Sequence, residues 1–578
     1  MATALQLSVD REHPELEDIE KHDQDNDRSS GSAYSQNRSP SLVEYMHYAA
    51  QARELERRLS TTQGSENGTP PESKKAKTPS EKSSSPIIDD EELLTARRAL
   101  RNASWAGIFY LITTDILGPF NAPFAFSQVG YVPGAVLYII MGVVACYTGL
   151  ILWKLFCKLD SDQYPIKTYA DISERIFGTW FKHLCSILQS LQLIINVGTI
   201  CLGNAQSVEQ IARNHQFCFS AAIIIWAGVG MVIGQIRSLK QYGWLANSAV
   251  FLNIFILIVT MAVVAHTPPN FASALAAFGR LPGTDENGVG PVLKAKFVGL
   301  PLFDKVNGIM QMVFAYGGAM IFPEFMAEMR RPMDFWKSMC CAQLLIGTIY
   351  MIFGLVVYSF QGQFTLPLAF QGMSSFGWQT LGNVIALITG IIAAGLYGNI
   401  GIKVAYYHIV EQWLNGPPLL SKKGRIVWTF MVIVYWALAF IVGSAIPQVQ
   451  TISGLVAAIC IMQFTYSFPP LLLVGFHWKL DKAHAAAKLT AAAKPKSEIG
   501  TGSADSPGAP SSPDVFVTKE VESEPYKPWP WYFHAFNIIL GLGSLAMAAL
   551  GMYGSGKAIQ ATFQAGGAAT SFGCGSPV

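Results

Sequence analysis

The chain has 578 residues, of which 51% are hydrophobic and only 14% are charged, and its mean hydropathy is +0.31. A water-soluble protein of this length carries far more charge, so we expect much of the chain to lie in a lipid bilayer. The first 100 residues hold 19 acidic and 13 basic side chains, which leaves a sparsely charged body. Such a body excludes nucleic acid as a partner.

Residues 1–100 are rich in Ser, Asp, Glu, Lys and Pro and begin without an apolar signal segment. This composition buries too little apolar surface to offset the entropy of ordering, so we predict a disordered cytosolic tail. Leu42, Met46, Ala49 and Ala52 recur with a helical rhythm, which predicts either a docking helix or a transient one. The tail also offers Ser, Thr and Lys side chains to kinases or the ubiquitin machinery, as most such tails do.

Eleven apolar windows are long enough to cross the roughly 30 Å hydrocarbon core of a bilayer, so we predict an all-α polytopic membrane protein. The windows are 104–127, 131–156, 183–206, 217–236, 243–266, 303–328, 337–360, 377–402, 425–446, 449–475 and 530–553. A ten-helix core at 101–475 follows the tail. A low-complexity cytosolic linker at 476–529 then precedes the last segment, 530–578, which holds the eleventh helix and an extracellular tail.

The first window contains "DILGPFNAPFAF", residues 115–126, where an acid, a Gly-Pro pair, an Asn and a second proline follow one another. Proline removes a backbone donor, glycine loosens a helix, and a charge near lipid is costly. We interpret the stretch as a helix break that stops near Leu117 and restarts near Asn121. Pro123 then lies in the first turn of the outer half, where a missing donor costs little.

The sixth window contains a second break at Gly317-Gly318, followed within about a turn by Pro323-Glu324. The two broken windows are five apart, so the second set of five enters the membrane from the opposite side. This pattern predicts two inverted repeats, 104–266 and 303–475, that enclose a site at the bilayer midplane.

Peptide dipoles at the two breaks have opposite signs. At the first break, free N–H groups of the outer half-helix point inward and suit a carboxylate. At the second, which we place at Ala315-Tyr316, unpaired carbonyls point inward and suit an ammonium group. A donor patch opposite an acceptor patch describes an α-amino acid zwitterion. The alternative is two ordinary kinks, because Gly and Pro are common in membrane helices.

Basic residues predict the orientation, because most of those in the body fall in loops that share one side with the N-terminus. These are Lys154, Lys158, Lys167, Arg175, Lys182, Arg237, Lys240, Arg330, Arg331, Lys337, Lys422, Lys423, Arg425 and the lysines of the linker. The opposite side holds little beyond Arg213, Arg280, Lys294 and Lys296. We therefore predict a cytosolic N-terminus and an extracellular C-terminus.

Four stretches carry a family resemblance: "DILGPFNAPFAFSQVG", "SLKQYGWLAN", "FAYGGAMIFPEFMAEMRRPMDFWKS" and "PQVQTISGLVAA". Together they resemble the amino acid/auxin permease family, and most closely its fungal neutral amino acid permeases of the N amino acid transport system type. The likeness covers roughly residues 100–475 and the eleventh window. It implies the five-plus-five fold of sodium symporters with an added eleventh helix, proton-driven uptake, and neutral aliphatic or aromatic substrates.

The resemblance also implies site residues. The carboxylate would be bound by the backbone of Gly118, Pro119, Phe120 and Asn121, and the ammonium group by carbonyls of Ile116, Phe314 and Ala315 beside Gly317. Tyr316 and Phe120 are candidate walls of the side-chain pocket, with helix packing as the alternative. Asn196 shares a helix face with Gln192 and either borders the pocket or bonds to a neighbouring helix.

Proton coupling needs a group that changes its charge inside the membrane. Asp115 and Glu324 are the only carboxylates well inside the windows, and either could carry the proton. The alternatives are a helix-break partner for Asp115 and an ion pair of Glu324 with Arg330 or Arg331. Lys403 either occupies the place that sodium takes in ion-coupled relatives or extends to the headgroups.

These expectations describe a secondary transporter at the plasma membrane, driven by a proton gradient in preference to sodium and needing no cofactor or metal. A vacuolar transporter of the same family and an amino acid sensor with a transporter-like core remain alternatives. The sequence lacks a nucleophile–base arrangement that would favour an enzyme. The nine cysteines lie mostly in apolar windows, so we interpret them as small membrane hydrophobes.

Overall fold

The structure is a computed structural model that describes residues 40–65, 101, 103–116, 120–213, 218–237, 239–417, 419, 421–445, 448–493, 528–564 and 571–575. Most of the predicted tail and linker, at 1–39, 66–100 and 494–527, lies outside these residues. The described part is all-α, and its only β-pairing consists of two isolated bridges. Nine of its helical segments are long and apolar enough to cross a membrane, as expected of a polytopic membrane protein.

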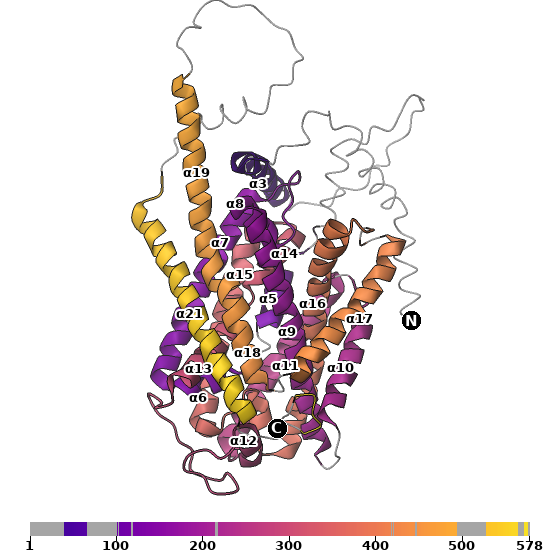
Figure 1. The fold of residues 1–578 in the computed structure, drawn as a ribbon, viewed down its shortest axis with the longest axis vertical. Helices are drawn as coiled ribbons and strands as arrows, with labels where there is room; N and C mark the ends of the chain where they lie inside the picture. The colour runs from indigo at the N-terminus through magenta and orange to yellow at the C-terminus, as the bar shows by residue number, and fades with distance from the viewer. Residues whose placement is uncertain are drawn as a thin grey trace, which may run out of the picture.

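The helices follow the predicted windows closely (Figure 1). They are α3 (Leu42–Ser65), α5 (Trp105–Ile116), α6 (Ala122–Val129), α7 (Tyr131–Leu159), α8 (Tyr169–Phe177), α9 (Thr179–Ala212), α10 (Phe219–Ile233), α11 (Leu239–His266), α12 (Phe271–Phe278), α13 (Leu302–Ala315), α14 (Phe322–Glu328), α15 (Phe335–Gln361), α16 (Phe376–Ala405), α17 (Lys422–Ala445), α18 (Val449–Val456), α19 (Phe468–Ala493) and α21 (Trp531–Gln564). A π-helical segment, Ala457–Ser467, joins α18 to α19.

Both predicted helix breaks are present. Helix α5 ends at Ile116 and α6 begins at Ala122, with a proline in its first turn. Helix α13 ends at Ala315, and a short 3₁₀ turn, Ala319–Ile321, leads into α14, which also has a proline in its first turn. The two interrupted helices are neighbours, because α6 packs against α13.

Long uninterrupted helices surround the breaks. Helix α9 packs against α16, α17 and α10, and glycines bring α9 and α17 into backbone contact. A Cβ atom at Gly198 would lie 2.8 Å from the carbonyl oxygen of Ala439, and one at Gly443 would lie 2.8 Å from the carbonyl oxygen of Gly198. Any larger side chain would push these two helices apart, as is usual where small residues set a close crossing in membranes.

The N-terminal tail differs from the prediction of disorder, because residues 42–65 form α3. This helix lies at the end of the bundle opposite the C-terminus and packs against α7 and α19 (Figure 1). Arg53 of α3 forms a 2.8 Å ion pair with Asp160, whose side chain is fully buried. The rhythm of Leu42, Met46, Ala49 and Ala52 leaves a docking helix open, and α3 is that helix. The composition of the tail predicts disorder because it averages over the segment, and it does not identify a partner far along the chain.

The linker also differs, since α19 continues to Ala493 and residues 476–493 of the predicted linker are therefore helical. This end of the bundle, with α3 and the loops at 160–168 and 329–334, is called the α3 face below.

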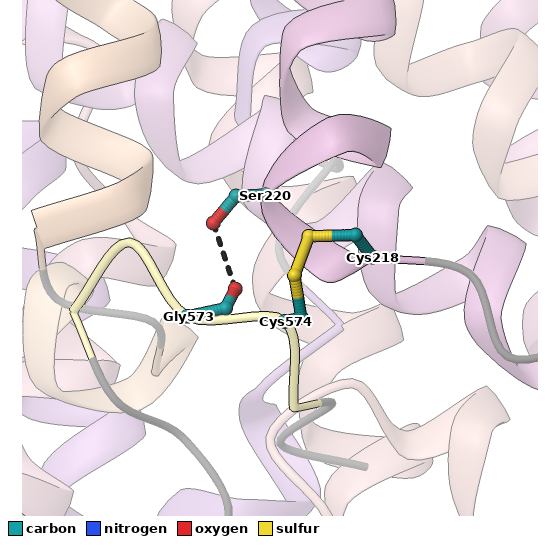
Figure 2. Close-up of a disulfide and its surroundings, with 4 residues drawn as sticks. All are labelled: Cys218, Ser220, Gly573 and Cys574. Atoms are coloured by element: carbon teal, nitrogen blue, oxygen red, sulfur yellow. Dashed lines mark hydrogen bonds between the residues drawn. A yellow bond between two sulfur atoms is a disulfide. The ribbon is translucent and has the colours of Figure 1, made fainter.

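Two of the nine cysteines are joined, which corrects their interpretation as small membrane hydrophobes. Figure 2 shows the disulfide between Cys218, just before α10, and Cys574 near the C-terminus, 356 residues apart. Beside it, Ser220 Oγ donates a 2.8 Å hydrogen bond to the carbonyl of Gly573. The opposite end of the bundle, where this bond ties the C-terminal segment to α10, is called the disulfide face. Sequence spacing gives no sign of so distant a pair.

We predict that the unfolded protein takes up seven maleimide–polyethylene glycol labels without reductant and nine with it. Seven free cysteines are found in the described residues, and the remaining two form the disulfide. The ladder of gel mobilities after labelling in detergent counts them. A Cys218→Ser, Cys574→Ser double variant should show seven labels under both conditions, and nine labels on wild-type protein without reductant would contradict the disulfide.

Candidate binding site between the interrupted helices

A buried cavity of about 120 Å³ lies where the two interrupted helices meet the long helices around them. Five of the lining elements are helices: α9, α11, α13, α16 and α18. The lining residues are Phe120, Asn121, Asn196, Thr199, Ile200, Gly203, Asn204, Ser207, Asn253, Phe314, Leu368, Phe370, Ala386, Thr389, Gly390, Ala393, Tyr397, Val449 and Ser453. The cavity is therefore apolar over much of its wall, with hydroxyl and amide groups at intervals.

Four predicted site residues, Phe120, Asn121, Asn196 and Phe314, line this cavity. Phe120 lies in the turn between α5 and α6, and its ring meets that of Phe370 edge to face, with centroids 5.1 Å apart. Phe314 lies in the last turn of α13. The structure thus brings residues of both breaks to one enclosed space, together with a polar residue of the third window.

Asn121 fastens the first break to the second half of the bundle. Its Nδ2 donates a 2.6 Å hydrogen bond to Gln311 Oε1, and Ser453 Oγ donates a 2.8 Å bond to the same oxygen. Asn121 Oδ1 remains buried without a partner. A buried amide oxygen without a donor is costly, so this atom is ready to accept a bond from a ligand in the cavity.

Three further lining atoms are buried acceptors without a partner in the protein: Asn196 Oδ1, Ser207 Oγ and Asn253 Oδ1. None of the described lining residues carries a formal charge at neutral pH. The cavity therefore offers hydrogen-bond acceptors to a polar ligand without attracting a side chain of net charge.

The second break is closed partly by its own backbone. The Phe314 carbonyl accepts a 3.2 Å bond from Gly317 N and is also a partner of the Tyr316 N–H at the end of α13. Ala315 is completely buried beside it. At Gly317, a Cβ atom would lie 2.7 Å from Ile461 Cδ1 and 3.1 Å from the Phe314 oxygen, so a side chain does not fit here without displacing its neighbours.

Tyr316 is placed away from the cavity. Its hydroxyl donates a 3.1 Å bond to the carbonyl of Tyr138, and the two rings pack edge to face against α7. This is the packing role that the sequence left open for Tyr316. Of the remaining residues at the first break, Gly118 and Pro119 lie outside the described residues, as do the side chains of Asp115 and Ile116.

Glu324 is partly buried in α14 and bonded to a residue that sequence reasoning missed. Gln189 of α9 donates from Nε2 to Glu324 Oε1 at 2.5 Å and to the carbonyl of Met320 at 3.0 Å. The other two oxygens of this pair, Gln189 Oε1 and Glu324 Oε2, are buried without partners. The signal available in the sequence was a glutamine inside an apolar window, one turn before Gln192.

Lys403 lies outside the cavity, at the end of α16. The carboxylate of Glu328, the last residue of α14, interacts electrostatically with the ammonium group of Lys403. Gln192 is also buried and not part of the lining, and neither of its side-chain polar atoms has a partner. The structure thus separates the predicted site residues into a group at the cavity and a group nearer the α3 face.

Two interrupted helices that border a buried, partly polar cavity inside a polytopic helical bundle define a membrane transport protein. Residues 101–490 match the family described as transmembrane amino acid transporter protein, and the chain belongs to that family. This membership identifies a transporter and not an enzyme, and it confirms the resemblance drawn from the four sequence stretches.

Curated relatives agree with the family. The chain is 24% identical to a transmembrane transporter of Fusarium pseudograminearum, over 64% of this chain and 75% of the relative. It is 25% identical to the N amino acid transport system protein of Neurospora crassa, over 63% of this chain and 74% of the relative. A more distant relative is the lysine histidine transporter-like 4 of Arabidopsis thaliana, which is 22% identical over 53% of this chain.

We predict that Gly317→Val lowers amino acid uptake, because the new side chain must displace Ile461 or the Phe314 carbonyl at the break. Overpacking typically costs about 1–3 kcal/mol, which corresponds to a roughly 5- to 150-fold loss of affinity. Uptake of radiolabelled amino acid, normalised to protein at the cell surface, measures the loss.

The matched control is Gly228→Val, because a Cβ atom at Gly228 meets nothing within 4 Å. Two smaller substitutions test whether the clash with Ile461 is the cause of the loss. Gly317→Ala alone should impair uptake, and the double variant Gly317→Ala, Ile461→Ala should restore it because the shorter side chain at 461 makes room. Unchanged apparent affinity in Gly317→Val would count against a binding role for this break.

Proposed function

We propose that the protein imports neutral aliphatic and aromatic L-amino acids by proton symport with alternating access. The observation that carries the proposal is the uncharged cavity at the junction of the two interrupted helices. Its walls include Phe120, Phe314 and Phe370, which suit an apolar or aromatic side chain. The chain's similarity to a protein named for the N amino acid transport system supports the same class of substrate.

The two ends of the zwitterion are bound by different breaks in this proposal. The start of α6 presents backbone donors around Phe120 and Asn121, which suit the carboxylate. Gly118 would add a further N–H in this proposal, whereas Pro119 has none and would only shape the turn. The end of α13 presents the carbonyls of Phe314 and Ala315 to the ammonium group, together with that of Ile116. Asn121 Oδ1 adds an acceptor without a partner.

The overall architecture proposed is eleven crossings with two inverted repeats of five helices. Nine long segments, the interrupted pair α5 and α6, and the 15-residue α10 together supply eleven apolar crossings. The matching breaks support the repeat, since each has a proline in the first turn of its second half. Helix α21 is the eleventh crossing and lies outside both repeats.

We place the α3 face in the cytosol and the disulfide face outside the cell. Arg330 and Arg331, together with most loop lysines of the core, are on the side of α3. The Cys218–Cys574 bond supports the same orientation, because disulfides persist in oxidising compartments. We propose the plasma membrane as the location.

Glu324 is the proton carrier that the geometry favours. When ionised, it accepts a bond from Gln189 Nε2, while Gln189 Oε1 has no donor. A proton on Glu324 Oε2 would add a donor to this pair, so Gln189 can form a hydrogen bond with Glu324 in either charge state. Asp115, at the first break, is the second candidate. Lys403, a cation at the end of α16 beside the carboxylate of Glu328, would balance charge during the cycle.

Direct uptake tests the proposal. In a cell that lacks amino acid permeases, uptake of radiolabelled neutral amino acids should rise as external pH falls from about 8 to about 5, and a protonophore should abolish it. Replacement of sodium by choline should leave the rate unchanged. Uptake that required sodium and ignored pH would contradict proton coupling, and absence of uptake for every neutral amino acid would contradict the substrate class.

We predict that Glu324→Gln removes the pH dependence of uptake and the accumulation against a gradient, while exchange of internal for external amino acid persists. The glutamine keeps the shape of the side chain but cannot exchange a proton. The control is Glu286→Gln, which changes an exposed carboxylate in a loop. Normal pH dependence in Glu324→Gln would transfer the role to Asp115, for which Asp115→Asn in the same assay should then lose it.

A further inference from the structure

Helix α3 is fastened to the transporter core by a buried ion pair. Arg53 Nη2 lies 2.8 Å from Asp160 Oδ2, and the two side chains are only 9% and 0% exposed. The same arginine bonds to Glu56 of its own helix at 2.8 Å. Because both charges are held away from water, removal of Arg53 would leave the buried Asp160 with the longer Arg101 pair as its only remaining ion pair among the described residues.

Asp160 also holds the chain that enters the first interrupted helix. Arg101 Nη1 lies 3.4 Å from Asp160 Oδ2, and Ile166 N donates to Oδ1 at 3.1 Å. Two residues after Arg101, Ala103 N donates to the carbonyl of Glu328 at the end of α14. The ends of both interrupted helices at the α3 face are thus bonded to each other and, through one carboxylate, to α3.

Three further contacts hold α3 on opposite sides. Glu56 Oε1 accepts a 3.1 Å bond from the backbone N–H of Met333, just after α14. Tyr164, in the loop between α7 and α8, donates a 2.8 Å bond to Glu44 Oε1. Arg175 of α8 lies over the ring of Tyr45, 4.5 Å from its centroid. Helix α3 therefore bridges the interrupted helices and the segment that connects α7 to α9.

An opening of the cavity toward the α3 face that moved the ends of α5 and α14 away from the loop at 160–168 and from α8 would pull on α3 from two sides. Helix α3 holds one side through Arg101, Asp160 and Met333, and the other through Tyr164 and Arg175. It cannot keep both sets of contacts when these parts separate. The family match begins at residue 101, so α3 lies outside the matched residues.

We propose that α3 is a releasable latch that holds the transporter closed at the α3 face and so limits substrate release on that side. The inference concerns the regulation of the site described above and rests on its proposed transport function. Arg53 is the positioning residue of the latch, because its buried charge sets the register of α3 on Asp160. Any event that undocks α3 shifts the protein toward the state open at this face.

Two native cysteines report separately on the undocking of α3 and on the opening of the α3 face. Cys157, in the last turn of α7, is half-buried while α3 is docked and lies near the charges of Arg53, Glu56 and Asp160, so undocking exposes it further. Cys185 of α9 is completely buried beside Ser173 of α8 and becomes accessible only when the α3 face opens. Labelling by a small membrane-impermeant thiol reagent, applied to vesicles with the α3 face outward, is quantified for each peptide by mass spectrometry.

The full-length Arg53→Met variant should raise the labelling rates of Cys157 and Cys185 at least about threefold over wild type, because labelling tracks the population of open states. Arg58→Met is the matched control, since Arg58 is 75% exposed on the same helix and pairs with Glu54. It should label like wild type. Tyr164→Phe removes one neutral contact of α3 and should change both rates in the same direction by less.

Unchanged labelling of both cysteines in Arg53→Met and Tyr164→Phe would overturn the latch, and so would a rise at Cys157 alone. These rates need no substrate, so they decide the latch even if the uptake assay rejects the proposed function. Where wild type does transport, Arg53→Met should raise the KM for external amino acid without lowering the maximal rate. A lowered maximal rate with unchanged KM would contradict the latch.

Discussion

The architecture of the binding site depends on unpaired backbone N–H and C=O groups, which the two interrupted helices leave inside the membrane bundle. An unpaired N–H or C=O in hydrocarbon costs several kcal/mol, so irregular backbone at that depth persists only where protein or a polar cavity surrounds it. Here α5 ends at Ile116 and α13 ends at Ala315, and neighbouring residues of both breaks line one cavity. The two breaks thereby leave backbone N–H donors and C=O acceptors near one cavity, and none of the described lining residues has a charged side chain.

Side-chain amides hold the interrupted helices to the intact ones. Gln311 receives bonds from Asn121 and Ser453, which joins the first break to α13 and α18. Gln189 of α9 does the same for α14 through Glu324. Because each amide both donates and accepts, these junctions tolerate a change of charge or of ligand that a fixed ion pair would oppose. The charged contacts lie at the α3 face, where Asp160 gathers two arginines.

Sequence reasoning located the breaks because their cause is local: glycine and proline act on the backbone where they stand. It missed what depends on distant partners. The cavity wall from α9, α11 and α16, with Thr199, Asn253 and Thr389, follows from packing that no single window shows. The same holds for the disulfide, whose cysteines are 356 residues apart, and for α3, whose Arg53 finds its partner 107 residues away. Tyr316 lies at the second break as predicted, and its side chain packs against α7, which is the alternative that the sequence left open.

The central claim is that peptide dipoles of opposite sign bind the two ends of one zwitterion. Competition by substrate analogues tests it most directly, with radiolabelled uptake of a neutral amino acid as the reference. The corresponding amine, which lacks the carboxylate, and the corresponding carboxylic acid, which lacks the ammonium group, should each fail to compete at concentrations where the intact amino acid competes fully. Competition by either analogue as strong as that of the amino acid would contradict the account.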